Sequence, residues 1–368
     1  MTFLIFAILV ALSLVFGKSK TVFNLILLFM WCMFTFCYGM VDDATYMAKY
    51  NGYSNQGSVE VIFRFLIKFC NSMGLNFAGF RGTIGLVFIV LIGYVVWKTA
   101  KHPNFVLILF FLYPFTMYTV QIRSALANAI LTVALTYLFK PETKNRIKLP
   151  FAGIEDNDLK YIILVLIATC IHTQSFFFII FLLVKKNSTK NIVKLTVLMN
   201  LVIGFVITPG MIVKVLNMFG AGNRLAEYLT VAYKMSSYRK YGPILYIVFA
   251  AVVSCGTCIY LLKLKINDFD RKKIEVLLKI NILSLSILAI FFRYTPEIYR
   301  IQEGILLTNY IYLTNEFRSA TMLKIRKRDF KLGGYVILLC VGYLWLSVLH
   351  YLSGDVWIPF WYNNTLFW

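Results

Sequence analysis

Apolar runs of membrane-spanning length follow one another along nearly the whole chain, and this pattern constrains the fold more than any other feature. A helix needs about 20 apolar residues to cross the hydrocarbon core of a bilayer. Of the 368 residues, 60% are hydrophobic and only 14% are charged, whereas soluble domains carry about 25% charged residues. The pattern therefore excludes a soluble globular protein. It predicts an all-α, polytopic membrane helix bundle with about 10 to 12 transmembrane segments.

The length leaves no room for a separate soluble domain, so we predict a single membrane domain over residues 1–368. Segment 2–16 has no basic region before it and no small-residue cleavage site after it, so we expect it to be a retained span. Segment 61–80 alternates apolar and basic residues, which predicts an amphipathic helix on the membrane surface. The other expected spans are 22–40, 82–97, 104–119, 124–139, 192–208, 243–262, 274–292, 303–317 and 333–349.

The net charge of +21 comes from 37 Lys and Arg against 16 Asp and Glu. In a soluble protein such an excess would suggest nucleic acid as a partner, but here most of the basic residues lie in short loops between apolar runs. The positive-inside rule assigns such loops to the cytoplasm. It places both termini outside, together with two outer loops, 41–81 and 209–242. The outer side still carries more basic than acidic residues, which points to an anionic ligand there and not to nucleic acid.

The apolar stretch 161–184 is expected to form a hairpin because basic residues lie at both of its ends. Lys160 precedes it, and Lys185 and Lys186 follow it, so both ends favour the cytoplasm. Two half-length helices with a turn at residues 171–175 satisfy this rule, provided that the turn faces protein or water. The sequence therefore predicts that His172 lies at the tip of a hairpin inside the bundle.

Ionisable groups within or beside the membrane are costly to place there, so they are the first functional candidates. On the predicted outer side they are Asp42, Asp43, Glu60, Arg123, His172, Arg224, Glu227, Arg293, Glu297 and Arg300. Arginine binds diphosphate oxygens through two parallel hydrogen bonds and can neutralise a diphosphate leaving group without a metal ion. A set of arginines, carboxylates and a histidine therefore suits a phosphate-bearing substrate, and we expect neither a cofactor nor a metal site.

An ordered series of short motifs accompanies these residues. Asp43-x-x-Tyr46-x-x-x-Tyr50 comes first, followed by GluValIlePheArgPheLeuIleLysPheCysAsnSerMetGly at 60–74 and ValGlnIleArgSerAlaLeuAla at 120–127. CysIleHisThrGlnSer at 170–175 and TyrArgIleGlnGluGly at 299–304 complete the series. In this order the chain resembles the EpsG-like, Wzy-type bacterial polysaccharide polymerases over about residues 40 to 315.

The resemblance implies a membrane glycosyltransferase that joins polyprenyl-diphosphate-linked repeat units on the outer side of the bacterial cytoplasmic membrane. It carries the family's acidic and tyrosine loop onto Asp43, Tyr46 and Tyr50, with Asp42 adjacent. Its other functional positions fall on Arg123, His172 and Arg300. The family usually has Gln after the first arginine, whereas Ser124 follows Arg123 here and Gln121 precedes it, so the amide that contacts sugar is left open.

We assign expected roles from this resemblance together with the charged and polar residues of the predicted outer side; Arg293 has no counterpart in the family. The general base is Asp43 or His172, with Asp43 preferred because it begins the outer loop where a sugar can arrive. The diphosphate ligands are Arg123, Arg300 and Arg293. The expected sugar-binding residues are Asp42, Tyr46, Tyr50, Gln121, Gln174, Glu227, Tyr228, Glu297 and Tyr299.

Structural roles compete with each of these assignments. Arg123 could anchor a helix end in the headgroups, His172 could be a core histidine, and Arg300 could form an ion pair with Glu297. The Asp-x-Asp strings at 156–158 and 268–270 lie directly before helices, where Asp caps exposed N–H groups, so we do not assign them to a metal-bound nucleotide sugar. The pair Cys255 and Cys258 lies on an apolar helix without a redox context.

Other functions use a similar set of residues. A polyprenyl-phosphate-sugar transferase that adds one sugar needs the same charges. A non-enzymatic flippase or transporter of lipid-linked oligosaccharides would be expected to show internal repeats, which the sequence lacks. A membrane O-acyltransferase would use the histidine but not the arginines. The expected partners are polyprenyl-diphosphate-linked glycans and membrane lipids, with a chain-length regulator protein as a further candidate.

Overall fold

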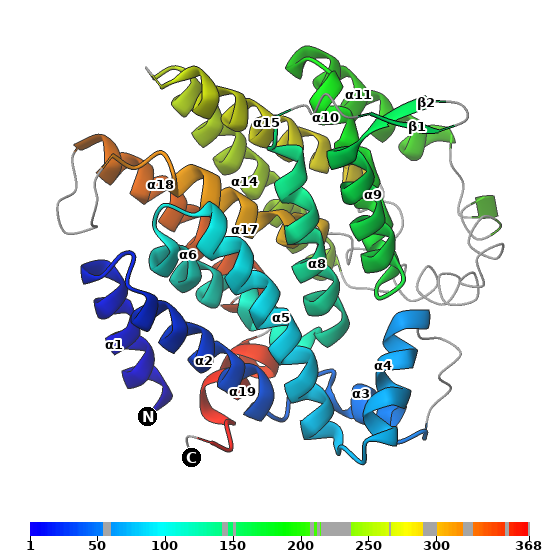
Figure 1. The fold of residues 1–368 in the computed structure, drawn as a ribbon, viewed down its shortest axis with the longest axis vertical. Coiled ribbons are helices and arrows are strands. Elements are labelled where there is room, and N and C mark those ends of the chain that lie inside the picture. Colours follow the sequence, from blue (N-terminus) through cyan, green and yellow to red (C-terminus); the bar gives the residue numbers. More distant parts are fainter. Residues whose placement is uncertain are drawn as a thin grey trace. The chain divides into compact units, whose positions relative to one another are not determined.

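The computed structural model is helical and confirms the predicted all-α, polytopic class (Figure 1). It describes residues 1–53, 60–141, 146–149, 152–206, 210–211, 214, 237–264, 266–289, 300–318, 327–349 and 353–366. Within this part of the chain, Phe77–Thr99, Pro103–Val120 and Thr189–Val206 are long and apolar enough to cross a membrane. Shorter apolar helices of 10–17 residues are Thr2–Val15, Lys20–Phe36, Ile122–Leu138 and Ala251–Leu262. The number of spans stays a prediction.

The chain divides into two compact units, Met1–Ile179 with Gly304–Trp368, and Ile180–Glu303. The helices of the first unit are α1 Thr2–Val15, α2 Lys20–Phe36, α3 Asp43–Tyr50, α4 Val61–Ser72, α5 Phe77–Thr99, α6 Pro103–Phe110, α7 Thr116–Val120, α8 Ile122–Leu138, α9 Asp156–Thr169, α18 Lys327–Leu344 and α19 Ile358–Tyr362. Helix α17, Arg300–Thr314, begins in the second unit and lies mostly in the first.

Two strands, β1 Arg146–Leu149 and β2 Ala152–Glu155, pair antiparallel between α8 and α9. The basic residues of this segment predict only a plain loop here. The strand segment Arg146-Ile147-Lys148-Leu149 alternates basic and apolar residues, which is the period of a strand. Helix α9 then begins at Asp156 and α15 (Asp268–Ser284) begins at Asp268, so both Asp-x-Asp strings lie in the first turn of a helix, where negative charge is favourable.

The surface helix expected over 61–80 is shorter than predicted. Helix α4 ends at Ser72, and Gly74 follows it with a φ of 70°. The amide of Leu75 donates to the carbonyl of Cys70, which closes the helix in the way typical of a glycine C-terminal cap. Asn76 then caps α5 by accepting from the amide of Gly79 at 2.9 Å. The following span therefore starts at Phe77 and not at residue 82.

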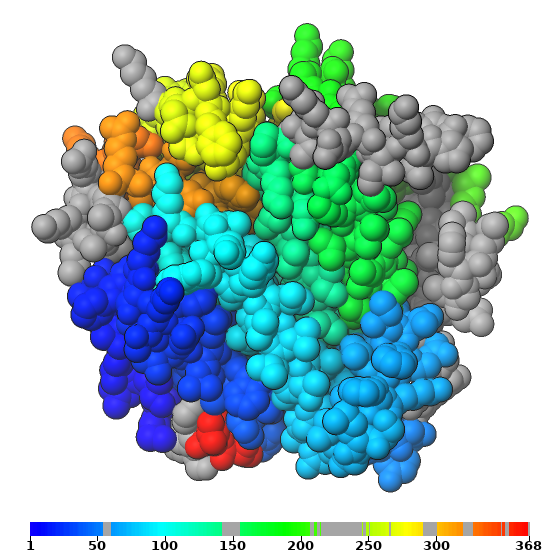
Figure 2. Space-filling model, viewed as in Figure 1, coloured from blue at the N-terminus to red at the C-terminus, as the bar shows by residue number. Residues whose placement is uncertain are grey.

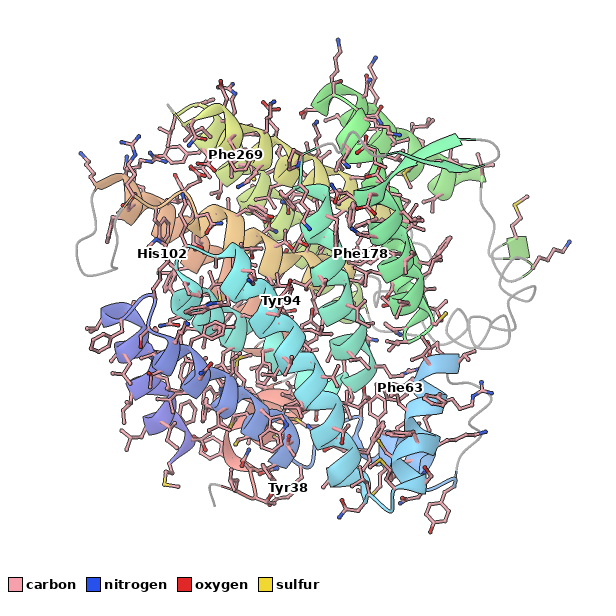
Figure 3. All side chains as sticks on the ribbon, in the orientation of Figure 1. Tyr38, Phe63, Tyr94, His102, Phe178 and Phe269 are labelled. Carbon is pink, nitrogen blue, oxygen red and sulfur yellow. The ribbon has the colours of Figure 1, made fainter. Side chains whose placement is uncertain are left out.

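Helix α4 is amphipathic, as predicted, and lies at the surface of the first unit (Figure 2). Phe63, Ile67 and Cys70 are buried, whereas Val61 and Phe65 are 73% and 64% exposed. The buried ring of Phe63, labelled in Figure 3, packs against the rings of Tyr46 and Phe80. The burial of apolar side chains thus fixes α4 against α3 and the start of α5.

Helix α5 packs closely against α2 because glycines line its contact face. A Cβ atom at Gly85 would lie 2.6 Å from the ring of Phe34, and one at Gly93 would lie 2.7 Å from Leu27. Small residues allow apolar helices to approach in this way. On its other side α5 packs against α8, which lies between α5 and α9 (Figure 1).

The predicted hairpin near residue 172 is present. Helix α9 ends at Thr169, and a 3-10 helix, Thr173–Leu182, follows after a short turn. The hydroxyl of Tyr161 in α9 donates to the carbonyl of Phe178 at 2.5 Å, so the chain returns along α9. Phe178 lies beside α8 and α9 in Figure 3. His172 lies in the turn.

Hydrogen bonds and ring contacts within the first unit divide its helix ends into two groups. The Glu60 end, as we call the first, comprises residues 36–43, 60, 119–123, 170–173 and 363–365. The Lys101 end comprises residues 16–19, 99–104, 139–141, 157–160 and 312–318. This grouping matches the alternation that the basic loops predict. Which end faces outward stays a prediction.

The second unit contains α10 Leu183–Lys186, α11 Thr189–Leu201, α14 Ser237–Leu262 and α15. Helix α15 packs against both α11 and α14. Asn200 of α11 donates to the carbonyl of Leu285 at 3.0 Å and accepts from the amide of Ala289 at 2.9 Å. The predicted outer loop 209–242 falls largely outside the described residues.

Candidate functional site

A half-buried carboxylate, Glu60, connects three segments at the Glu60 end of the first unit. Glu60 directly precedes α4, but its side chain does not cap that helix. The backbone position is instead fixed by the hairpin, since the amide of Ile62 donates to the carbonyl of Cys170 at 3.1 Å. This bond satisfies one of the free N–H groups at the start of α4. The carboxylate is therefore available for other partners.

The two oxygens of Glu60 have different partners. Oε2 accepts from Nη1 of Arg123, at the start of α8, over 2.6 Å. Oε1 accepts from the amide and the hydroxyl of Thr173, at 3.3 and 3.2 Å. Nδ1 of His172 lies 3.6 Å from the same oxygen. The structure thus brings together Arg123 and His172, two of the residues expected from the sequence, through Glu60, which the sequence names as an ionisable candidate without a specific role.

The cluster is shielded from water but not sealed. The side chains of Arg123, Glu60 and His172 are 16%, 14% and 14% exposed. Burial raises the pKa of Glu60, but the interaction with His172 and the charge of Arg123 outweigh it, so the pKa of Glu60 lies below its usual value. Glu60 is therefore ionised at neutral pH and is a weak proton acceptor. Of these three side chains, His172 is the one suited to accept a proton.

Tyr46, another of the expected site residues, lies beside this cluster. Cζ of Arg123 is 5.9 Å from the centre of the Tyr46 ring, within the range of a cation–π interaction. Tyr46 itself is 8% exposed. The aromatic face therefore helps to hold the guanidinium in place.

Asp43, the preferred base of the sequence analysis, lies in a separate ion pair. Its Oδ1 accepts from Nη1 of Arg81 at 2.6 Å and its Oδ2 from the amide of Met40 at 3.0 Å. Arg81 also donates from Nε to the carbonyl of Phe34 and from Nη2 to that of Thr119. Arg81 is 2% exposed and joins the ends of α2, α5 and α7 to α3. Arg81 is not among the site residues predicted from the sequence, although an arginine inside an apolar run is itself a signal of a buried partner.

The remaining expected residues differ in their positions: some lie near the cluster, one begins α17, and others lie outside the described residues. The hydroxyl of Tyr50 donates to the carbonyl of Leu75 at 2.6 Å, which gives it a structural contact, and Asp42 directly precedes α3. Gln121 and Gln174 flank Arg123 and His172 in the chain, and no hydrogen bond within the described residues reaches the buried Oε1 of either. Arg300 begins α17, in the second unit. Outside the described residues lie Arg224, Glu227, Tyr228, Arg293, Glu297 and Tyr299.

The arrangement offers a cation for an anionic group, a histidine for proton transfer and a carboxylate between them. No group of three or more His, Cys, Asp or Glu side chains suited to a metal ion occurs in the part of the chain that the structure describes. That the protein needs no cofactor remains a prediction from the sequence.

Fold and site together define a polytopic, all-α membrane protein with a half-buried cluster of an arginine, a carboxylate and a histidine at one end of its helices. The EpsG family model matches residues 20–361, nearly the whole chain, and the chain therefore belongs to the EpsG family, a Wzy-like polysaccharide polymerase family. No curated protein and no solved structure matches the chain.

Proposed function

We propose that the protein polymerises polyprenyl-diphosphate-linked oligosaccharide repeat units on the outer side of a bacterial cytoplasmic membrane. Membership of the EpsG family supports a polysaccharide polymerase of the membrane. The proposed substrate and reaction are supported mainly by the cluster of Arg123, Glu60 and His172. This cluster combines an arginine that can bind diphosphate with a histidine that can accept a proton, in one partly open site.

In the proposed reaction, a hydroxyl of one lipid-linked glycan attacks the anomeric carbon of a second. The bond between that carbon and the diphosphate oxygen breaks, and its electron pair stays with the diphosphate. The acceptor oxygen forms the new glycosidic bond and its proton passes to His172. Arg123 offsets the negative charge that develops on the leaving diphosphate.

Other residues have supporting roles in this proposal. The unpartnered amide oxygens of Gln121 and Gln174 are suited to accept from sugar hydroxyls. Arg300, Arg293, Asp42, Tyr228, Glu227, Glu297 and Tyr299 remain proposed ligands of diphosphate or sugar. We do not propose Asp43 as the base, because both of its oxygens already accept hydrogen bonds.

The outward orientation rests on the distribution of charge. The Lys101 end and its flanking loops contain Lys18, Lys20, Lys98, Lys101, Lys140 and Lys160. The positive-inside rule assigns this end to the cytoplasm. The Glu60 end, with the proposed site, then faces outward.

The test is polymerisation of lipid-linked repeat units by purified protein, followed as a ladder of products. Arg123→Lys keeps the charge but loses the two-pronged contact, so its rate should fall roughly 30- to 1000-fold. His172→Gln should lower the rate by roughly 100-fold or more. Arg328→Lys is the matched control, because Arg328 also pairs with a glutamate, Glu316 at 3.9 Å, but belongs to the Lys101 end.

Three results would count against the proposal. Normal activity of Arg123→Lys and His172→Gln would remove this cluster from the site. A single product larger by one sugar would make the protein a transferase that adds one sugar. Movement of lipid-linked glycan across vesicle membranes without any new glycosidic bond would make it a transporter.

A further inference from the structure

Glu60 contacts both Arg123, the residue proposed to bind the diphosphate, and His172, the proposed base. Its Oε2 is held by Arg123 at 2.6 Å, and its Oε1 faces Thr173 and His172. The described residues provide Glu60 with these three side-chain partners. A change at Arg123 is therefore transmitted to His172 through a single side chain.

Arg123 has one donor, Nε, that no described residue accepts from. The buried Nε forms no hydrogen bond within the described residues, and Nη1 is bound by Glu60. A guanidinium has five N–H groups in one plane and binds phosphate best through two of them at once. The unpartnered Nε, enclosed beside an ion pair, indicates that an anionic ligand can add to this guanidinium.

A diphosphate bound to Arg123 would bring negative charge close to the ionised carboxylate of Glu60. Like charges at such separations repel strongly in a partly buried site. The diphosphate carries more charge than a carboxylate and forms more hydrogen bonds to the guanidinium, so it competes with Oε2 for Arg123. Oε1 retains its contacts with Thr173, so the displaced carboxylate stays beside His172.

We propose that Glu60 is a displaceable counter-ion: the incoming diphosphate takes its place on Arg123, and the released carboxylate then orients His172 and supports the positive charge that the imidazole gains. This inference rests on the proposed function. It makes Glu60 a positioning residue that couples arrival of the donor substrate to activation of the base. Before the diphosphate binds, Arg123 and Glu60 neutralise each other.

Coupling of this kind has a measurable signature, because the carboxylate opposes diphosphate binding and yet assists the reaction. Glu60→Gln removes the competing charge and keeps the shape. We expect this variant to bind farnesyl diphosphate, a soluble stand-in for the lipid donor, roughly 10-fold more tightly than wild type. Its turnover should nevertheless fall, so KM and kcat should decrease together. Loss of a merely structural glutamate would not combine tighter diphosphate binding with slower turnover in a protein that still folds.

Calorimetric titration of the full-length protein in detergent with farnesyl diphosphate measures this effect. Glu316→Gln is the matched control, since Glu316 pairs with Arg328 at the Lys101 end and its loss should leave the affinity unchanged. If Arg123→Gln binds farnesyl diphosphate as wild type does, the proposed function fails. If Arg123→Gln loses binding while Glu60→Gln binds no more tightly than wild type, only the counter-ion inference fails.

A measurement on the wild-type protein tests the counter-ion role of Glu60 even if Glu60→Gln does not fold. The chain has three histidines, so the imidazole nitrogen signals of His172 can be assigned in the NMR spectrum by comparison with His172→Gln. Saturating farnesyl diphosphate should shift the His172 signals in wild type but not in Arg123→Gln. Unchanged His172 signals in the saturated wild-type protein would overturn the inference.

Discussion

Two arginines at the Glu60 end are buried beside carboxylates, and their hydrogen bonds give them different roles. All three nitrogens of Arg81 donate to protein oxygens, one of which belongs to Asp43. Arg123 uses Nη1 for Glu60, and its Nε has no hydrogen bond within the described residues. A guanidinium whose three nitrogens all bind protein oxygens has few donors left for a ligand, whereas one with an unpartnered Nε has more. Arg81 is therefore structural, and Arg123 is the binding candidate.

At the scale of the residue we predict that Asp43→Asn destabilises the protein without abolishing its chemistry. The substitution leaves Arg81, 2% exposed, as an uncompensated buried charge, which should lower the free energy of unfolding by about 3–5 kcal/mol. Replacing Arg81 as well, by Met, should recover part of this loss because no buried charge then remains. Thermal unfolding in detergent measures both effects. An unchanged unfolding temperature with complete loss of polymerisation would instead make Asp43 the base.

At the scale of the element, the hairpin, α8 and α17 meet at one glycine. A Cβ atom at Gly304 would lie 2.7 Å from Oδ1 of Asn128 and 2.7 Å from Cζ of Phe178. Asn128 lies on α8, and Phe178 lies on the returning arm of the hairpin whose turn holds His172. The absence of a side chain at Gly304 thus lets α17 approach both α8 and the returning arm of the hairpin closely.

We predict that Gly304→Ala weakens this packing. The added methyl group must displace a buried amide or ring, which should cost roughly 1–3 kcal/mol of stability. Gly334→Ala in α18 is the matched control, because no atom lies within 4 Å of a Cβ built there. That substitution should stabilise its helix by about 0.5–1 kcal/mol. Thermal unfolding of both variants checks the pair, and equal stabilisation by both would mean that the three segments are not in close contact.

The sequence predicts a helix or hairpin correctly where the distribution of charge or the length of an apolar run allows one interpretation. The lysines at both ends of 161–184 predict the hairpin, and apolar runs predict the helices. The end of α4 was missed, although Gly74 and Asn76 are the residues that close one helix and open the next. The short strands were missed because a basic loop of few residues satisfies the charge rule equally well.

The site was harder to predict than the elements, for a physical reason. Glu60 and Arg123 are 63 residues apart, and Glu60 and Thr173 are 113 apart. No local sequence pattern encodes the approach of segments so distant in the chain. In addition, a carboxylate directly before a helix is most simply interpreted as a cap of that helix. Arg123 and His172 could be selected because ionisable groups beside a membrane are costly. Their connection through Glu60 depends on how α4, α8 and the hairpin pack.

At the scale of the whole molecule, contacts among loops support the alternation of the chain across the membrane. The amide of Tyr38, after α2, donates to the carbonyl of Asn363 near the C-terminus, and the ring of Phe3 stacks on Trp361. The N-terminus, the end of α2 and the C-terminal segment therefore lie on one side, as the basic loops predict. Orientation with respect to the cell follows once the location of one of these ends is known.

Cys170 gives that location directly, and we predict that it reacts from outside the cell. Cys170, in the hairpin turn, is exposed, whereas the other six cysteines are buried or half-buried. A membrane-impermeant maleimide should therefore label the wild-type protein in intact cells, and Cys170→Ala should abolish the labelling. Lys20→Cys in the Cys170→Ala background should be labelled only after permeabilisation, because Lys20 is exposed beside the Lys101 end. The reverse result, with Cys170 protected and Lys20→Cys labelled in intact cells, would place the Arg123, Glu60 and His172 cluster in the cytoplasm and exclude an outward-facing polymerase.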